Sequence, residues 1–398
     1  MMSKEVFVSG NTAVATGVSL VEPGVIAAYP ITPQSPAVEK ISEFIADGEM
    51  KSEYIEVESE YSAMSACIGA EAVGARAFTA TSSQGLALMH EMLHFASGQR
   101  LPIVMAVANR TLAPPWGILN DERDTIAQRD TGWLQFYVES AQEALDTIVQ
   151  AYRLSEQEDI LTPTMVCYDG YIISHAYEKV VVPDKDEVQS FIPEYEPDEI
   201  LNVEDPKTLG YAPSGYNTEY RVKQQLGTET AKGAIGDITE DYADQFGRDY
   251  VGMVEEYGPE NPDVTLVTLG SVTGTVRDVV DKLNDQGREV GLVKLRTLRP
   301  FPYEQLADIL KGTGAVGVLE KDISFGYEGA VFSEVRSALQ GTNNVPSMNF
   351  IAGLGGRDIT MENIENVYEK LFTMAETGES EGRIEFVGYR FSDGKGII

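Results

Sequence analysis

The sequence predicts an α/β protein built on parallel β-sheets, and two observations support this fold class. Residues 5–180 and 264–373 each alternate short apolar segments, typical of buried strands, with longer segments whose apolar residues recur at helical spacing. This alternation is typical of parallel strands whose two faces are covered by helices. The 398 residues, with 43% hydrophobic residues and 37 glycines, suffice for two or three domains with substantial cores.

The first region contains the following expected elements. Strands are expected at 7–8, 25–28, from 55, and at 75–81, 101–107, 135–138 and 164–168. Helices are expected from 11, at 36–46, from 60 to 74, and at 86–98 and 141–155. Polar loops at 29–36, 82–85 and 109–124 follow three of these strands. Ligands of open parallel sheets collect beyond the C-terminal ends of the strands, so these loops are the expected site.

Residues 183–255 interrupt the alternation. The stretch 183–205 contains nine acids, one Lys and several prolines, and we expect an extended connection without the apolar content for its own core. Residues 221–257 have helical spacing with much Tyr and Gln, which predicts a solvated or partner-contacting helix. The predicted first domain therefore spans 1–255 and includes this acidic extended and helical connection at 183–255.

A smaller α/β domain is expected at 256–398. Its expected strands are 264–269, 290–295, 315–319 and 348–351, and its expected helices end near 286, 310, 339 and 373. The residues beyond 374 are expected to form an irregular tail.

The composition argues against several classes of function. The net charge of −33, from 63 acids and 30 bases, argues against nucleic-acid binding and against an anionic membrane surface, because phosphate contacts need Lys and Arg. The sequence has no run of 18 apolar residues and begins without a signal peptide, which predicts no membrane span and a cytoplasmic location. Cys67 and Cys167 are too few for an iron–sulfur cluster and are expected to be buried thiols. His90 and His94 lie four residues apart without a third ligand type, so we expect helix packing and no metal site.

Glu60 lies where a short strand with acids at 56 and 58 gives way to a run of small residues with helical spacing. A carboxylate at the start of a helix is stabilised by the partial positive charge of the helix N-terminus. Two interpretations of this stretch remain open on its own residues. Glu60 is either a helix-start acid at a solvated edge or an acid that points into a cofactor pocket.

Four motifs, each near the end of an expected strand, carry a family resemblance. They are Tyr-Pro-Ile-Thr-Pro at 29–33, Glu-Ser-Glu-Tyr-Ser-Ala at 58–63, Thr-Ala-Thr-Ser-Ser-Gln-Gly at 79–85, and Ala-Asn-Arg at 108–110. With these motifs the chain closely resembles the alpha subunit of the 2-oxoacid:ferredoxin oxidoreductases, and most of all the pyruvate synthase members of that family. The resemblance continues through Arg-Asp-Thr-Gly-Trp at 129–133, Leu-Arg-Pro-Phe-Pro at 298–302 and Lys-Asp-Ile-Ser-Phe-Gly at 321–326, and so covers most of the chain.

The resemblance implies a fold and a reaction. The fold is a thiamine-pyrimidine-binding parallel-sheet domain followed by a smaller transketolase C-terminal-like domain. The reaction converts a 2-oxoacid and coenzyme A to acyl-CoA, carbon dioxide and two electrons for ferredoxin, or the reverse. In that family, beta-, gamma- and delta-type subunits carry the Mg²⁺–diphosphate site and the 4Fe–4S clusters. The small number of Cys residues and the lack of a Gly-Asp-Gly diphosphate motif here agree with this division.

The resemblance also implies roles for individual residues. Glu60 matches the catalytic glutamate that hydrogen-bonds the aminopyrimidine ring of thiamine diphosphate and shares a proton with a ring nitrogen. The other cofactor-binding positions are Pro30, Ile31, Ser83 and Gln84. Arg110 and Thr32 match the residues that hold the substrate carboxylate, for which the planar guanidinium is suited. No metal ligand is expected in this chain.

One stretch departs from the expected family pattern. The loop Ala-Pro-Pro-Trp-Gly-Ile at 113–118 is bulkier and stiffer than we expect of the pyruvate enzymes, and Arg123 adds a cation nearby. A branched-chain, aryl or oxalate-like 2-oxoacid therefore remains an alternative to pyruvate. Two alternatives belong to other classes: a subunit of a non-oxidative thiamine enzyme, such as a sulfonate decarboxylase or half of a transketolase, and a non-catalytic assembly subunit.

Overall fold

A computed structural model describes residues 4–341, 345–380 and 382–390, which form two compact units. The first unit contains the residues up to Met253 together with Arg296–Phe301, and the second contains Val254–Leu295 and the residues from Pro302 onward. Each unit is built on one mainly parallel β-sheet, so the predicted α/β class is confirmed. The sequence predicted one division, between residues 255 and 256. It did not predict that residues 296–301 belong to the first unit.

The first unit contains a seven-stranded sheet in the order β12-β6-β7-β5-β4-β2-β3. Its strands are β2 (Val25–Ala28), β3 (Glu53–Glu56), β4 (Ala77–Thr81), β5 (Val104–Asn109), β6 (Leu134–Tyr137), β7 (Thr164–Asp169) and β12 (Thr297–Arg299). All pairs are parallel except β12 with β6. Every residue of β4, β5 and β7 is buried, as expected of central strands covered on both faces.

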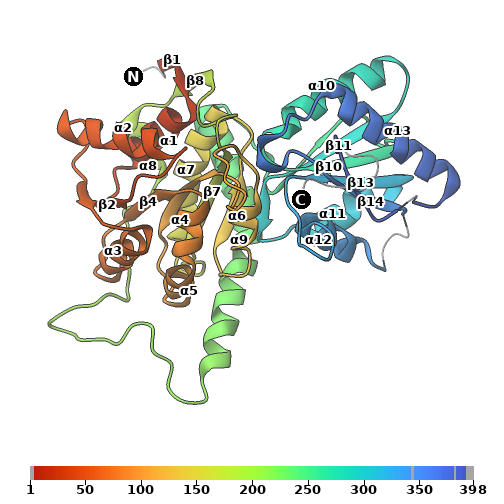
Figure 1. Cartoon of the computed structure of the whole chain (residues 1–398). Coiled ribbons are helices and arrows are strands. Elements are labelled where there is room, and N and C mark those ends of the chain that lie inside the picture. The colour runs from red at the N-terminus through yellow and green to blue at the C-terminus, as the bar shows by residue number, and fades with distance from the viewer. Residues whose placement is uncertain (1–3, 342–344, 381, 391–398) are drawn as a thin grey trace. The chain divides into compact units, whose positions relative to one another are not determined.

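Helices cover both faces of this sheet, as Figure 1 shows. One layer contains α1 (Gly10–Val21), α2 (Ser35–Ala46) and α7 (Ala141–Ser155), and the other contains α3 (Glu60–Ala72), α4 (Ser83–Leu88) and α5 (His90–Gly98). Helices α1 and α7 approach closely at Gly17, where a Cβ atom would lie 2.9 Å from the Leu145 carbonyl oxygen. The single helix expected at 86–98 is divided at Met89 into α4 and α5.

The first strand expected for the sheet lies outside it. β1 (Lys4–Ser9) instead pairs antiparallel with β8 (Tyr177–Val182), and the two form a separate sheet. The prediction was wrong because periodicity identifies a strand but not its partner, which here lies far along the chain.

The connection at 183–255 is more ordered than expected. α8 (Lys185–Phe191) replaces part of the expected extended segment, because Val188, Phe191 and Ile192 are buried despite the acids around them. Residues 193–216 form a long irregular stretch that leads into α9 (Asn217–Phe246), as Figure 1 shows. The expected helix ends at Phe246 and not at 257, because β9 (Val254–Tyr257) pairs antiparallel with β11 of the second unit.

The end of α9 is anchored to α7 by the buried side chain of Asp146. Its two carboxylate oxygens accept hydrogen bonds from Tyr242 Oη at 2.7 Å, from Arg248 Nε and Nη2 at 2.6 and 2.9 Å, and from Tyr250 Oη at 2.5 Å. The Asp146 side chain is fully buried and that of Arg248 is 18% exposed, so the pair is largely shielded from water.

We therefore expect Asp146→Asn to lower the free energy of unfolding by about 3 kcal/mol, because the change leaves Arg248 without its counter-charge in a shielded position. Urea denaturation followed by circular dichroism measures this change. Asp241→Asn is the matched control: it breaks the ion pair with Arg153, but Asp241 is 55% exposed, so a loss below about 1 kcal/mol is expected. Equal losses for the two variants would contradict the anchoring role of Asp146.

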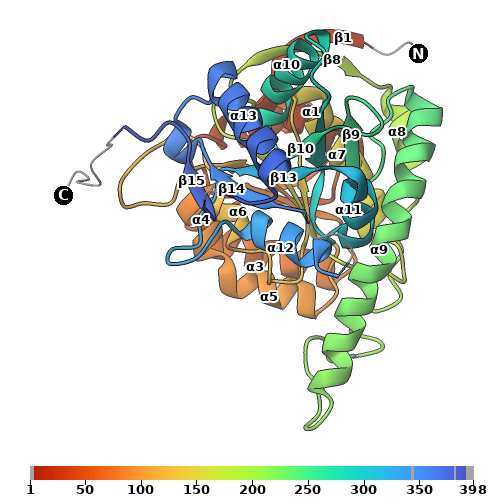
Figure 2. The same cartoon turned by 90° about the vertical axis from the view of Figure 1, so that its right-hand side faces the viewer.

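The second unit contains a six-stranded sheet in the order β15-β14-β13-β10-β11-β9. Besides β9, its strands are β10 (Val264–Thr268), β11 (Val290–Leu295), β13 (Ala315–Glu320), β14 (Ser347–Ile351) and β15 (Ile384–Phe386). Figure 2 shows α10 (Val272–Asp285) and α13 (Met361–Thr377) together on one face, and α11 (Tyr303–Ile309) and α12 (Ala330–Leu339) on the other. The expected irregular tail was wrong for β15, which pairs with β14, and the tail residues 381 and 391–398 lie outside the described part of the chain.

Among the residues described, no helix combines the length and apolarity needed to cross a membrane.

Candidate functional site

Four neighbouring strands of the first sheet present polar residues at one edge. In the order β3, β2, β4 and β5, the segments that follow these strands carry Glu60, Thr32, Gln84 and Arg110. Because these strands are parallel, their C-terminal ends lie at the same edge. The chain order reverses between β2 and β4, and such a switch point is where open α/β sheets bind ligands.

Glu60 is the first residue of α3, as the sequence predicted. Ser59 caps the helix, since its hydroxyl accepts a hydrogen bond from the Ser62 amide at 3.3 Å. The Glu60 residue is only 7% exposed. Its carboxylate has no hydrogen-bond or ion-pair partner among the residues that the structure describes, which is costly for a buried acid unless a ligand completes the site.

Gly85 leaves the space that the Glu60 carboxylate occupies. A Cβ atom at Gly85 would lie 2.6 Å from Glu60 Oε1 and 2.6 Å from Thr81 Oγ1. A larger residue there would displace the carboxylate, so Gly85 brings the first turn of α4 against the first turn of α3.

The Arg110 guanidinium joins two of the loops. Its Nη1 donates to the Thr32 carbonyl oxygen at 2.7 Å, and its Nη2 donates to Gln84 Oε1 at 2.6 Å. The buried Arg110 Nε and Gln84 Nε2 atoms have no hydrogen-bond partner in the described part of the chain. Burial lowers the pKa of Arg110, while the nearby charges of Asp124, Tyr171 and Glu60 raise it. The site thus holds a cation and unpaired donors beside the Glu60 carboxylate.

The loop after β2 is held by hydrogen bonds to its backbone. Asn11 Nδ2 donates to the Pro33 carbonyl oxygen at 2.9 Å, and the Ile31 amide donates to Gln34 Oε1 at 3.4 Å. Thr32 and Pro30 are exposed, and within the described chain the Thr32 hydroxyl makes no hydrogen bond. The structure therefore brings Thr32 to Arg110 through its carbonyl oxygen and leaves its hydroxyl available.

The turn after β4 contains Ser83, which has a left-handed backbone conformation with φ of 49°. Its hydroxyl donates to the Thr111 carbonyl oxygen at 2.8 Å, and its amide donates to Asp124 Oδ2 at 2.9 Å. Ser83 therefore holds the turn in place with its own groups. Asp124 was not among the predicted site residues, and its position in a run of acids was the only signal in the sequence.

The bulky loop at 113–118 lies at the surface. Trp116 is 82% exposed and Ile118 is 53% exposed. Arg123, expected as an additional cation, donates to Asp121 Oδ2 at 3.2 Å and to Thr111 Oγ1 at 2.6 Å, so its charge is used within the loop.

The expectation that both cysteines are buried thiols is confirmed. Both cysteines are free and buried. The rings of His90 and His94 pack edge to face with their centroids 5.0 Å apart. No group of three possible metal ligands occurs in the residues described.

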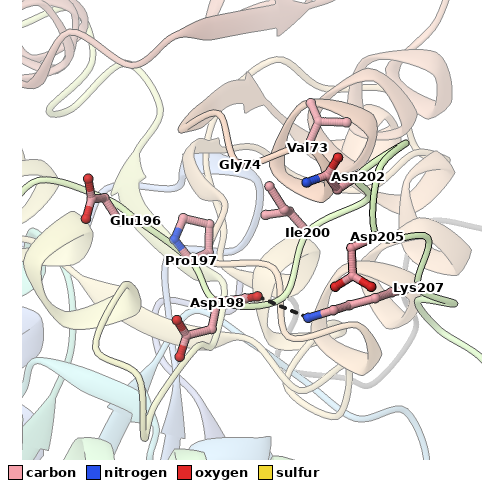
Figure 3. Close-up of a pocket in the computed structure, with 9 residues that line it drawn as sticks. All are labelled: Val73, Gly74, Glu196, Pro197, Asp198, Ile200, Asn202, Asp205 and Lys207. Carbon is pink, nitrogen blue, oxygen red and sulfur yellow. Dashed lines mark hydrogen bonds between the residues drawn. The ribbon is translucent and has the colours of Figure 1, made fainter.

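A hollow of about 540 Å³ lies elsewhere on the first unit, as Figure 3 shows. Val73 and Gly74, just beyond the C-terminal end of α3, line one side, and residues from 196 to 207 line the other. Within this segment, Lys207 Nζ donates a hydrogen bond to the Asp198 carbonyl oxygen at 3.3 Å. Glu60 is at the opposite end of α3, roughly 20 Å away for a helix of this length, so the hollow is separate from the candidate site.

Comparisons with protein families match both units. Residues 16–239 match the family described as pyruvate flavodoxin/ferredoxin oxidoreductase, thiamine diphosphate-binding. Residues 262–364 match the pyruvate:ferredoxin oxidoreductase core domain II.

Similar proteins extend over nearly the whole chain. Pyruvate synthase subunit PorA of Methanocaldococcus jannaschii is 50% identical over 365 residues, which are 90% of this chain and 93% of that protein. PorA of Methanothermobacter thermautotrophicus is 48% identical over 364 residues, 91% of this chain and 94% of that protein. Ketoisovalerate oxidoreductase subunit VorA of Pyrococcus horikoshii is 45% identical over 383 residues, 95% of this chain and 96% of that protein.

Two solved structures share the fold. The 2-oxoglutarate:ferredoxin oxidoreductase of Magnetococcus marinus has a TM-score of 0.71 at 19% identity, covering 92% of this chain and 65% of the other. An inactive split-gene transketolase has a TM-score of 0.52 at 15% identity, covering 92% of this chain and 99% of the other.

Proposed function

Because this chain belongs to the pyruvate flavodoxin/ferredoxin oxidoreductase family, as the alpha subunit of a thiamine-diphosphate-dependent 2-oxoacid oxidoreductase, we propose that it supplies the aminopyrimidine side of that active site. The proposed reaction converts pyruvate and coenzyme A to acetyl-CoA, carbon dioxide and reduced ferredoxin, or runs in reverse. The observation that carries this proposal is the buried, unpartnered Glu60 carboxylate at the sheet edge that also presents Arg110.

The residues at this edge fit the cofactor. The buried Glu60 carboxylate has no hydrogen-bond partner in the described chain, and the buried Gln84 Nε2 has none there either. In our proposal, Glu60 binds the aminopyrimidine ring, and Ser83, Gln84, Pro30 and Ile31 line that part of the site. When bound, thiamine diphosphate supplies a thiazolium ring that takes up the electron pair released by decarboxylation.

Glu60 is proposed to hold and return a proton at the aminopyrimidine ring nitrogen. A carboxyl group performs this role well when water is excluded, because hydrogen bonds to a charged group are stronger in a low-dielectric site. The 7% exposure of Glu60 and the close contact of Gly85 supply that setting.

Arg110 and Thr32 are proposed to bind the substrate carboxylate. Two of the three guanidinium nitrogens are occupied by protein oxygens, which fixes the orientation of the group. Arg110 Nε remains available, and the free Thr32 hydroxyl is carried by the same loop whose carbonyl oxygen Arg110 binds. A structural Arg110 that pairs with Glu60 is the alternative. The described chain has no ion pair between them, which favours the substrate role, although the Glu60 charge does act on Arg110.

The remaining half of the active site is proposed to come from partner subunits. Large apolar side chains are exposed around the sheet edge that carries Glu60 and Arg110: Tyr29, Ile55, Tyr61, Trp116, Ile118, Leu119 and Ile172. Exposed apolar groups that gather in one place mark a protein interface. In our proposal a beta-type subunit covers this edge and brings the Mg²⁺–diphosphate site. Gamma- and delta-type subunits and their 4Fe–4S clusters pass electrons to ferredoxin, and the complex is cytoplasmic.

We expect the isolated chain to have no oxidoreductase activity and to bind thiamine diphosphate weakly, since it holds one side of the cofactor. Absorption spectroscopy should show no iron–sulfur bands, because two cysteines, Cys67 and Cys167, are too few to hold a four-Cys cluster. A coloured single-chain preparation that reduces an electron-acceptor dye with pyruvate and coenzyme A would contradict the proposal.

The substrate is tested by a panel of 2-oxoacids. PorA relatives favour pyruvate, whereas the 45% identical VorA relative makes ketoisovalerate the second candidate. The complex reconstituted with all subunits is assayed for coenzyme-A-dependent dye reduction with pyruvate, ketoisovalerate, an aryl 2-oxoacid and 2-oxoglutarate. We expect the highest kcat/KM with pyruvate. A higher value with ketoisovalerate would reassign the substrate, and turnover without dye reduction would indicate a non-oxidative thiamine enzyme.

A further inference from the structure

Asp124 is a buried carboxylate that joins the two strand ends of the candidate site. It lies on α6 (Arg123–Ile126) and is 1% exposed. Oδ2 accepts hydrogen bonds from the Ser83 amide at 2.9 Å and the Arg110 amide at 3.0 Å. Oδ1 accepts from Asn109 Nδ2 at 2.8 Å and from the Thr125 amide at 2.9 Å.

Three of these four bonds connect segments apart in the sequence. Ser83 opens the turn after β4, and Arg110 follows β5, so one carboxylate oxygen sets the distance between the two turns. The side chains of the same segments meet on the ligand side, where Arg110 Nη2 donates to Gln84 Oε1 at 2.6 Å. The Asp124 bonds therefore hold the backbone beneath the contact of Gln84 with Arg110.

The charge and burial of Asp124 also fit a role in positioning other site residues better than a role in stabilising the fold. Burial raises the pKa of Asp124 to about 7, and the bonds from Asn109, Arg110 and Ser83 only partly offset that effect. Burial of this carboxylate thus disfavours folding above about pH 4, where the unfolded acid is ionised, and the penalty grows until about pH 7. Only an ionised carboxylate accepts from all four donors at once, whereas a carboxamide turns an N–H toward one pair.

We propose that Asp124 is a positioning residue for 2-oxoacid binding, which holds the Arg110 guanidinium, in its contact with Gln84, where the substrate carboxylate would bind. This inference rests on the proposed function of Arg110 as the substrate-binding cation. In this proposal Asp124 acts through Arg110 and does not itself bind the substrate.

The test is Asp124→Asn in the reconstituted complex with pyruvate. We expect KM to rise and kcat/KM to fall about 10- to 100-fold, because a misplacement of about 1 Å in a binding group costs up to about 10²-fold. The Kd for thiamine diphosphate should change less than the KM, since the main cofactor contact is proposed for Glu60, and Asp124 reaches the cofactor side through the backbone amide of Ser83. Asp121→Asn is the matched control: Asp121 is buried in the same loop and accepts hydrogen bonds from the Arg123 amide and Nε, so a much smaller change in KM is expected.

A double-mutant comparison separates positioning from general damage. In the Arg110→Ala background, Asp124→Asn should lower kcat/KM much less than it does in the wild type, because the group it positions is already absent. Equal effects in both backgrounds would overturn the inference. If Arg110→Ala lowers kcat/KM and Asp124→Asn leaves it unchanged, the inference fails and the proposed function stands. If Arg110→Ala itself has no effect, the proposed function fails and the inference fails with it.

A second variant covers the case in which Asp124→Asn does not assemble. Asn109→Ala removes one donor to Asp124 Oδ1 and leaves the two backbone donors to Oδ2 in place. We expect a rise in KM in the same direction but smaller, with unchanged thiamine diphosphate binding. An unchanged KM in an assembled Asn109→Ala complex would overturn the inference.

Discussion

Glu60→Gln is expected to slow hydrogen–deuterium exchange at the C2 position of bound thiamine diphosphate by about 10²–10⁴-fold. The amide has nearly the shape of the acid but cannot give and take the proton that we assign to Glu60. The Glu60 carboxylate, which lies beside Gly85, makes no hydrogen bond or ion pair in the described chain. Its replacement should therefore affect cofactor activation. Nuclear magnetic resonance of the quenched cofactor measures this exchange.

The fold should tolerate the change. Glu60 has no hydrogen-bond partner to lose among the described residues, and Ser59 still caps α3 through the Ser62 amide. Glu58→Gln is the matched control: Glu58 lies two residues earlier, is exposed and accepts from the Ser62 hydroxyl. Its exchange rate should equal that of the wild type. Wild-type exchange in Glu60→Gln would remove Glu60 from the proposed mechanism.

Arg110→Ala is expected to lower kcat/KM for the 2-oxoacid about 10- to 100-fold. Loss of a charge-assisted hydrogen bond costs about 1.5–3 kcal/mol, and that cost appears in kcat/KM when the bond persists in the transition state. Arg110→Lys should fall between the wild type and Arg110→Ala, because it keeps the charge but loses the planar fork that reaches Thr32 and Gln84 together.

Cofactor binding distinguishes this role from a structural one. In both Arg110 variants the Kd for thiamine diphosphate should stay near the wild-type value, since the proposed aminopyrimidine contact belongs to Glu60. An Arg110→Ala complex that loses the cofactor, while its KM for the 2-oxoacid is unchanged, would assign Arg110 to the scaffold instead.

Local sequence signals predicted much of the framework of the site. The run of small residues with apolar positions at helical spacing identified Glu60 as the start of a helix, and the structure begins α3 at that residue. The buried apolar runs located β2, β4, β5 and β7. The alternation of strands and helices predicted that these strands are parallel, so the loops that follow them were expected at the same edge of the sheet. These features depend on neighbouring residues, which is why the sequence alone predicts them.

The features that the sequence did not predict depend on distant contacts. The pairing of β1 with β8 joins a segment that comes before β2 in the chain to one that comes after β7. The three residues of β12 return from beyond β11 to extend that sheet beside β6. Asp124 appears in the sequence as one acid among several, and only the tertiary structure buries it and supplies its donors from Ser83, Asn109 and Arg110.

The central claim is that this chain supplies one side of the active site and that partner subunits supply the other. Its most direct test is complementation of the partner subunits, measured as coenzyme-A-dependent dye reduction with pyruvate. We predict no turnover by the partner subunits alone, full turnover after addition of the wild-type chain, and almost none after addition of the Glu60→Gln chain. Turnover by the partner subunits alone, or its full restoration by Glu60→Gln, would contradict the claim.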